Sequence, residues 1–253
     1  MLLANKTAVV YGAGGAIGSA VSRAYAREGA RVFLAGRTAA PLDRVASAIL
    51  SAGGAAEVAT VDVLERASVV AHTSSVAATS GGIDIVFNAT SNDDVQGAAL
   101  VDMTFEDFMR PVIKSVSAHH TIATTVAEHM KRRGGGVILV MAGGREAIPA
   151  LGGSHVAWSA LAGLCRQLSS ELGADGIRLA WLLSPGSPDA TTPEATGRTR
   201  PGGHSVDPLA ASTVLGRRPT LDDVGNAAAF LSSDWARTMT ATEVNLTAGS
   251  VID

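Results

Sequence analysis

The feature that most constrains the fold is a regular alternation of short β-branched runs with alanine-rich amphipathic stretches. Amphipathic helices are expected over about residues 16–29, 40–52, 65–80, 104–133, 154–173 and 221–233. Strands that alternate with helices in this way indicate a parallel sheet covered on both faces. The sequence therefore predicts an α/β fold, a doubly wound parallel sheet in three layers. The expected strands are KTAVVYG (6–12), RVFLAGR (31–37), AEVATVDV (56–63), IDIVFNA (83–89), GVILVMAGG (136–144), IRLAWLLSPG (177–186) and EVNLTAG (243–249).

No linker or internal repeat interrupts the alternation. The chain has 253 residues, of which 47% are hydrophobic and 17% charged, and this composition suits a well-buried core. We therefore expect one domain over residues 1–253. One irregular stretch, around residues 187–215, is rich in Pro, Gly, Ser and Thr, which is typical of a functional loop, and it is predicted to be a substrate lid.

Composition and charge exclude several classes of protein. The net charge of −3 is spread along the chain, and the basic pairs are short and lack neighbouring aromatic residues, which argues against nucleic-acid binding. Cys165 is the only cysteine, so neither an internal disulfide nor a thiolate metal cluster is expected. No run approaches the roughly 18 apolar residues of a membrane span, and the N-terminus does not resemble a signal peptide. A cytoplasmic protein without a metal site or membrane contact is expected.

A glycine-rich turn joins the first expected strand to the first helix. The segment YGAGGAIGSA contains Gly12, Gly14, Gly15 and Gly18. Glycines at this position let the chain turn tightly and bring backbone N–H groups close to a pyrophosphate at the helix N-terminus. A tight turn without a ligand is the alternative. The place of the turn in the first strand–helix–strand unit favours a dinucleotide site.

From these motifs, the chain resembles the short-chain dehydrogenase/reductase superfamily along nearly all of its length. The glycine-rich turn is similar to that family's T-G-x-x-x-G-x-G motif, with Tyr11 in place of the threonine and Ala16 in place of the middle glycine. The family's adenine-contacting pair, its N-A-G turn and its Pro-Gly after the sixth strand also have counterparts here. The resemblance implies a Rossmann-like fold and a nicotinamide cofactor held by Gly12, Gly14, Gly15, Ala16, Ile17, Gly18, Arg37, Thr38, Asp62, Val63, Asn88, Ala89, Thr90, Trp158, Pro185 and Gly186.

The end of the second strand bears on which nicotinamide cofactor binds. A carboxylate there would accept hydrogen bonds from the adenine-ribose 2′-hydroxyl, whereas an arginine pairs with a 2′-phosphate. The residues are Ala35, Gly36, Arg37 and Thr38, with no acid among them. This pattern favours NADP(H) over NAD(H), with Arg37 as the phosphate ligand. The alternative is an exposed arginine without a ligand.

The family's catalytic residues are replaced. In the family, a tyrosine exchanges a proton with the substrate, and a lysine four residues later lowers the pKa of that tyrosine. A serine after the fifth strand and an asparagine in the long preceding helix complete the set. The segment SALAGLCRQLSSELG resembles the residues that follow the lysine, which assigns Ser154 to the tyrosine position and Trp158 to the lysine position. The serine position falls at Ala142 or Gly143, and Ser115 takes the asparagine position. The resemblance thus implies a divergent member that lacks the usual catalytic residues.

Few side chains could supply the missing chemistry. Ser154 could orient a carbonyl but needs another group to exchange a proton, and His155 is the nearest candidate because histidine titrates near neutrality. Trp158 could stack on a nicotinamide, or it could simply fill an obsolete site. The other polar candidates are Arg145, Glu146 and His204, each with the alternative of a solvated side chain, whereas His119, His120 and His129 are expected at the surface or at subunit contacts.

Two main functions remain open at this point, beside a weaker third one, a non-redox enzyme that uses the same crevice. One is an NADP(H)-binding oxidoreductase of altered mechanism, which transfers hydride to or from a small carbonyl or alcohol with weak turnover. The other is a non-catalytic nucleotide-binding protein that acts as a sensor, scaffold or partner subunit. In proteins of this family, the helices that correspond to residues 104–133 and 154–173 form the main subunit contact, so a homodimer or homotetramer is expected.

Overall fold

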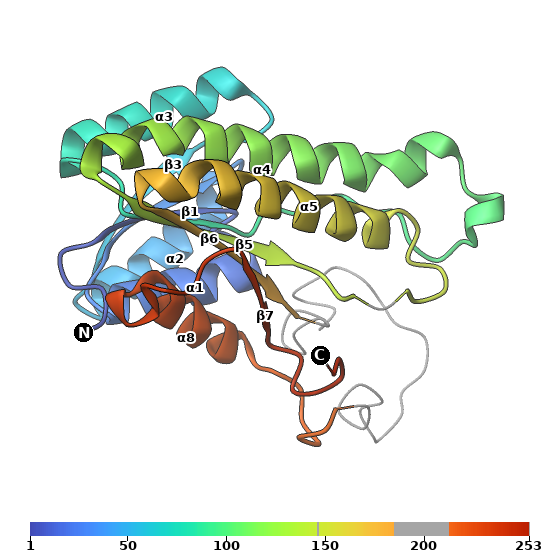
Figure 1. The fold of residues 1–253 in the computed structure, drawn as a ribbon. Helices are drawn as coiled ribbons and strands as arrows, with labels where there is room; N and C mark the ends of the chain where they lie inside the picture. The colour runs from blue at the N-terminus through green and yellow to red at the C-terminus, as the bar shows by residue number, and fades with distance from the viewer. Residues whose placement is uncertain (146, 185–212, 253) are drawn as a thin grey trace.

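A seven-stranded parallel sheet lies at the centre of the computed structural model, which describes residues 1–145, 147–184 and 213–252 (Figure 1). The strand order is β3-β2-β1-β4-β5-β6-β7, so the direction of winding reverses between β1 and β4. All six neighbouring pairs are parallel. This topology confirms the predicted fold class. The strands are β1 (Thr7–Tyr11), β2 (Arg31–Gly36), β3 (Ala55–Thr60), β4 (Ile85–Asn88), β5 (Gly136–Ala142), β6 (Ile177–Leu183) and β7 (Thr242–Asn245).

Helices cover both faces of the sheet (Figure 1). One face carries α1 (Ala16–Arg27), α2 (Ala39–Ser51) and α8 (Leu221–Ser232). The opposite face carries α3 (Arg66–Ser80), α4 (Phe105–Arg133) and α5 (Ser154–Leu172). Short 3-10 turns lie at Leu100–Asp102, Gly173–Asp175 and Asp234–Ala236. The described helices begin and end within a few residues of the predicted boundaries.

The two layers of core follow from the alternation of side chains along each strand. In β1, Val9 and Tyr11 pack toward α3, α4 and α5, whereas Ala8 and Val10 pack toward α1, α2 and α8. A central parallel strand is buried on both faces, which explains why its sequence is a continuous apolar run. The carboxyl ends of β1, β2 and β4 therefore meet at one edge of a rigid sheet.

Some predicted features lie outside the described residues. These are Glu146, Pro185, Gly186, His204 and the proposed lid, of which only residues 213–215 are described. Within the described ranges, no helix is long and apolar enough to cross a membrane. The described histidines, cysteine and carboxylates also form no group of three or more that could hold a metal ion.

Candidate functional site

A cavity of about 260 Å³ opens beside the glycine-rich turn, at the edge of the sheet where the strand order reverses. We call it the turn cavity. Its walls come from the glycine-rich turn, the segments at the ends of β2 and β4, the segment after β3, two residues of α2 and one residue of α4. In doubly wound folds the ligand binds at such a switch point. Of the residues expected to bind a cofactor, Gly12, Gly14, Gly15, Arg37, Thr38, Asp62, Val63, Ala89 and Thr90 line the turn cavity.

The glycines of the turn are required by close backbone contacts. Gly12 has a φ of +76°, and a Cβ atom there would lie 2.6 Å from the carbonyl oxygen of Ala89. A Cβ at Gly18 would overlap with the carbonyl group of Gly12, because the first turn of α1 packs directly on the strand end. Gly15 precedes α1 and provides no side-chain cap, and Ala16 and Ile17 begin the helix. The first N–H groups of α1 are thus suited to bind an anion.

Asn88 at the end of β4 carries a buried donor without a partner. Its Oδ1 accepts hydrogen bonds from the backbone N–H of Thr90 at 3.0 Å and from the Thr90 hydroxyl at 2.8 Å. Its Nδ2 has no hydrogen-bond partner in the described part of the chain. A buried unpaired amide beside a cavity is a natural place for a polar ligand atom or an ordered water. The glycine cradle and this amide together fit the polar groups of a dinucleotide.

An ion pair beside the turn cavity, between a half-buried lysine and an exposed aspartate, was not predicted from the sequence. Lys114 of α4 lines the cavity and pairs with Asp93, which lies in the segment after β4. The hydroxyl of Ser91 also donates to the Asp93 carboxylate, at 3.0 Å. The hydrogen bond from Lys114 is the main reason that the pKa of Asp93 lies below its usual value, and Ser91 and Arg37 lower this pKa further. Two cations of the cavity wall, Lys114 and Arg37, thus act on the Asp93 carboxylate beside it.

The segment 91–97, which we call the strap, connects the turn cavity to the start of α5. The hydroxyl of Ser154 donates to Oδ2 of Asp94 at 2.8 Å. The backbone N–H of Gly97 donates to the carbonyl of Ala150 at 2.9 Å. A Cβ at Gly152 would overlap with the carbonyl oxygen of Val95, so the two segments touch through their backbones. Adjacent aspartates of the strap therefore contact Lys114 on one side and Ser154 on the other.

Trp158 lies one helical turn after Ser154 and covers the residue expected at the family's serine position. Ser154 is fully buried, and Trp158 is half-buried. The indole ring packs on Gly143 so closely that a Cβ at residue 143 would overlap with ring atoms. Trp158 is not among the residues that line the turn cavity. The predicted contact between Trp158 and the cofactor stays a prediction.

The histidines take different positions. His155 follows Ser154, and its Nδ1 is buried with no hydrogen-bond partner among the described residues. The expectation of a surface position was wrong for His119, which is buried and donates from Nδ1 to the carbonyl of Ser115 at 2.6 Å. Helix α4 packs against both α3 and α5. More of its surface is therefore buried than the pattern of apolar residues in its sequence indicates. His120 is exposed and His129 is half-buried.

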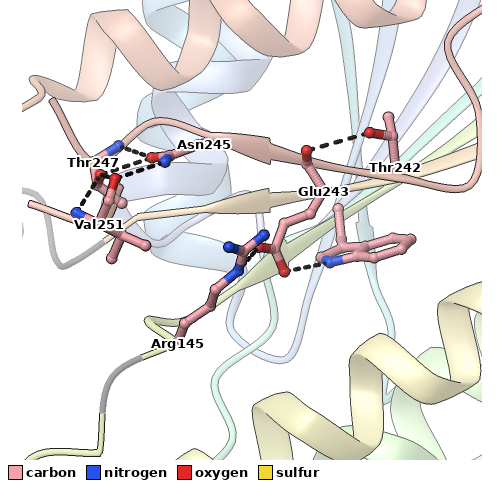
Figure 2. Close-up of polar contacts among 7 residues, drawn as sticks. Arg145, Thr242, Glu243, Asn245, Thr247 and Val251 are labelled. Carbon is pink, nitrogen blue, oxygen red and sulfur yellow. Dashed lines mark hydrogen bonds and ion pairs between the residues drawn. The ribbon is translucent and has the colours of Figure 1, made fainter. Parts of the chain in front are cut away.

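Arg145 is fixed to the last strand of the sheet. Figure 2 shows its guanidinium beside the carboxylate of Glu243 in β7, with which it forms an ion pair. The same carboxylate accepts a hydrogen bond from the indole N–H of Trp181 at 2.7 Å. Next to this cluster, the Asn245 amide donates to the carbonyl of Val251 at 2.9 Å (Figure 2). Arg145 is therefore held at the carboxyl edge of the sheet, where its contact with a substrate stays a prediction.

Comparisons with known proteins agree with this architecture. Residues 12–250 match the model of a family described as enoyl-(acyl carrier protein) reductase. The chain is 30% identical to D-threitol dehydrogenase from Mycolicibacterium smegmatis, over 99% of this chain and 94% of that protein. It is also 30% identical to 3α-hydroxysteroid dehydrogenase from Mediterraneibacter gnavus, over 95% of this chain and 94% of that protein.

A solved structure shows the same fold. The crystal structure of an NAD⁺-bound xylitol dehydrogenase superposes with a TM-score of 0.85 at 22% identity, covering 98% of this chain and 100% of that one. The two curated relatives above are named as dehydrogenases, and proteins of this family use NAD(H) or NADP(H) as cofactors. The matches show, in agreement with the reversal point of the sheet and the glycine cradle, that the chain is a member of the short-chain dehydrogenase/reductase superfamily.

Proposed function

We propose that this chain is an NADP(H)-binding oxidoreductase that interconverts a small secondary alcohol and its carbonyl compound, with an altered route for the proton. Two relatives at 30% identity are named as dehydrogenases of D-threitol and of a 3α-hydroxysteroid, so an alcohol substrate fits the family. The nicotinamide would supply the hydride chemistry. The glycine-rich turn, Asn88 and Arg37 would bind its phosphates and ribose groups, with Arg37 beside a 2′-phosphate.

The hydrogen bond from Ser154 to Asp94 is the observation that carries this proposal. A serine hydroxyl is a far poorer acid or base than an activated tyrosine, so it needs a second group to exchange a proton. The 2.8 Å contact provides one, because the Asp94 carboxylate can accept the Ser154 proton. The Ser154 oxygen, which is fully buried in the substrate-free chain and has to become accessible to a substrate, would then accept the proton of the alcohol. This relay favours the direction of alcohol oxidation, because a carboxylate accepts the proton. The group that changes its charge is Asp94, a residue of the strap.

A nucleotide-binding protein without turnover is the second candidate. The close packing of Trp158 on Gly143 favours it, because an apolar ring stands at the position where the family has a cation. Neither an activated phenol nor the usual ammonium group contributes to this proposed site. Binding of the nucleotide would be retained, since the turn cavity is built from other residues.

The test measures single-turnover oxidation of a panel of secondary alcohols and polyols with NADP⁺. Ser154→Ala and Asp94→Asn should each lower the rate about 10²–10⁴-fold, the usual contribution of general acid–base catalysis. The double variant should be no slower than the slower single variant, because the two residues act in one relay. Ser159→Ala is the matched control, since the Ser159 hydroxyl lies on the same helix and donates to the backbone carbonyl of His155.

Two results would decide against the relay. Wild-type turnover in both single variants would remove Ser154 and Asp94 from the chemistry. Tight NADPH binding without oxidation of any alcohol in the panel would favour the second candidate.

A further inference from the structure

The ion pair between Lys114 and Asp93 joins two unequal partners. The Lys114 side chain is 12% exposed and lines the turn cavity, whereas the Asp93 side chain is 47% exposed and belongs to the strap. Asp93 also has a φ of +52°, in the left-handed region that a residue with a side chain rarely adopts. The cation is thus fixed in the wall of the cavity, while its carboxylate partner is the member that can leave.

The neighbouring charges show what could take the place of that carboxylate. Arg37, which follows β2, is the other cation in the wall of the turn cavity among the described residues, and its charge also acts on Asp93. Asp62, the one acid in the wall among the described residues, is engaged by its own turn, where its Oδ1 accepts the N–H of Leu64 at 3.0 Å. A phosphate monoester such as a 2′-phosphate carries more charge than a carboxylate and has three acceptor oxygens, so it competes well for a lysine. The two adjacent phosphates of a pyrophosphate together also carry more charge than one carboxylate.

We propose that Lys114 is a phosphate ligand of the nucleotide site and that Asp93 is its built-in competitor, which a phosphate group of the nucleotide displaces. The proposal rests on the proposed function, because it assumes that the turn cavity binds an adenine dinucleotide. It adds a ligand on α4 to a site otherwise formed by loops at the strand ends. It also gives the strap a role in setting how tightly the nucleotide binds.

Calorimetric binding of three probes to the purified full-length chain tests this proposal. The probes are 2′,5′-ADP, ADP and adenosine, which carry phosphates at different positions or none. Asp93→Asn should tighten binding of the phosphate that contacts Lys114 about tenfold, because the competing charge is gone and asparagine tolerates the left-handed backbone. Lys114→Met should weaken the same probe about tenfold, and adenosine should respond to neither change. The more responsive of 2′,5′-ADP and ADP identifies which phosphate Lys114 contacts.

The double variant provides the sharpest comparison. If Asp93 acts through Lys114, Asp93→Asn should give no gain in the Lys114→Met background. Glu57→Gln is the matched control, because it removes the same charge and an ion pair with Arg31 that lies at the opposite ends of the strands. This control should leave all three affinities unchanged.

The outcomes separate this inference from the proposed function. Unchanged or weaker phosphate binding in Asp93→Asn, or an equal gain in the Lys114→Met background, would overturn the inference and leave the oxidoreductase intact. Because the probes lack a nicotinamide, binding as expected together with absent alcohol oxidation would overturn only the proposed function. Binding that appears in Asp93→Asn but is undetectable in the wild type would support the inference.

Discussion

At the glycine-rich turn, Gly12 and Gly18 let backbone segments touch and leave an open cavity beside them, whereas at Gly143 the space of a missing side chain is filled by the ring of Trp158. Both regions lie at the carboxyl ends of the parallel strands. In the first, absent side chains keep room for a ligand. In the second, the absent side chain makes room for a neighbour, so the two regions use the same residue type for opposite purposes.

The difference shows what glycine in a sequence can and cannot tell. A glycine at a strand end indicates close approach, but the approaching group can be a ligand, a backbone or a side chain. Gly152 and Gly153 before α5 illustrate the second case, because added Cβ atoms would overlap with backbone oxygens of Val95 and Phe108. The region around Gly143 and Trp158 is therefore closely packed, while the turn cavity stays hollow.

The largest expected effect comes from two buried histidines, His72 beside Tyr11 at the end of β1 and His119 on α4. Burial lowers the pKa of His72, below the end of β1, and of His119, beside Ser115, to about 4. Since a histidine in the unfolded chain titrates near 6.5, acid favours the unfolded state. The free energy of unfolding should be fully retained above pH 6.5 and fall toward pH 4, by about 3 kcal/mol for each histidine.

Denaturant unfolding at a series of pH values measures this loss. His72→Asn and His119→Asn should each remove one part of the slope, since an asparagine amide can replace the Nδ1 hydrogen bond without titrating. If the pH dependence of the unfolding free energy disappears in only one of the two variants, that histidine alone accounts for the loss in acid.

The second expected effect is specific to the contact between Gly143 and Trp158. Gly143→Ala should lower the free energy of unfolding by about 2 kcal/mol, because the new Cβ overlaps with the Trp158 ring. In the Trp158→Ala background the same substitution should cost much less, a non-additivity that a double-mutant cycle detects. Gly144→Ala is the control, since a Cβ there would meet no atom within 4 Å. Equal costs for the two alanines would mean that the Trp158 ring moves aside freely.

The smallest expected effect belongs to the turn cavity. Arg37→Ala should remove most of the preference for NADPH over NADH, a loss of about tenfold or 1.4 kcal/mol, because Arg37 lines the cavity where a 2′-phosphate would bind. Ligand-induced fluorescence changes measure both affinities. Arg44→Ala, an equal loss of charge at an exposed position on α2, should leave the preference unchanged. Equal affinities in the unmodified chain would contradict the assignment of Arg37.

The fold could be predicted from the sequence because it depends on local patterns. Buried strands such as β1 and β5 are continuous apolar runs, and the turn at Gly12 requires glycine for reasons that act within a few residues. Much of the turn cavity follows in the same way, since strand ends of a parallel sheet meet at one edge. Even the exposed edge strand β3 could be placed, because its position in the alternation compensates for its weak apolar pattern.

The strap could not be predicted, because its contacts are distant in sequence. The segment SNDDVQG indicates a polar loop, but nothing periodic shows that Asp94 reaches Ser154 or that Asp93 reaches Lys114. Two consecutive acids a few residues after the end of β4 are the one signal that could have drawn attention to it. The direction of the Trp158 ring was equally hidden, because it depends on the space left by a residue on another element.

The Gly143–Trp158 contact also restricts the order in which this chain can change. A larger residue at position 143 is tolerated only after position 158 has become smaller, since the ring occupies the space that the new atoms need. Single steps in the other order pass through a less stable intermediate, so the two positions are coupled along any mutational path. A serine could therefore be introduced at position 143 without overlap only after Trp158 has been replaced by a smaller residue.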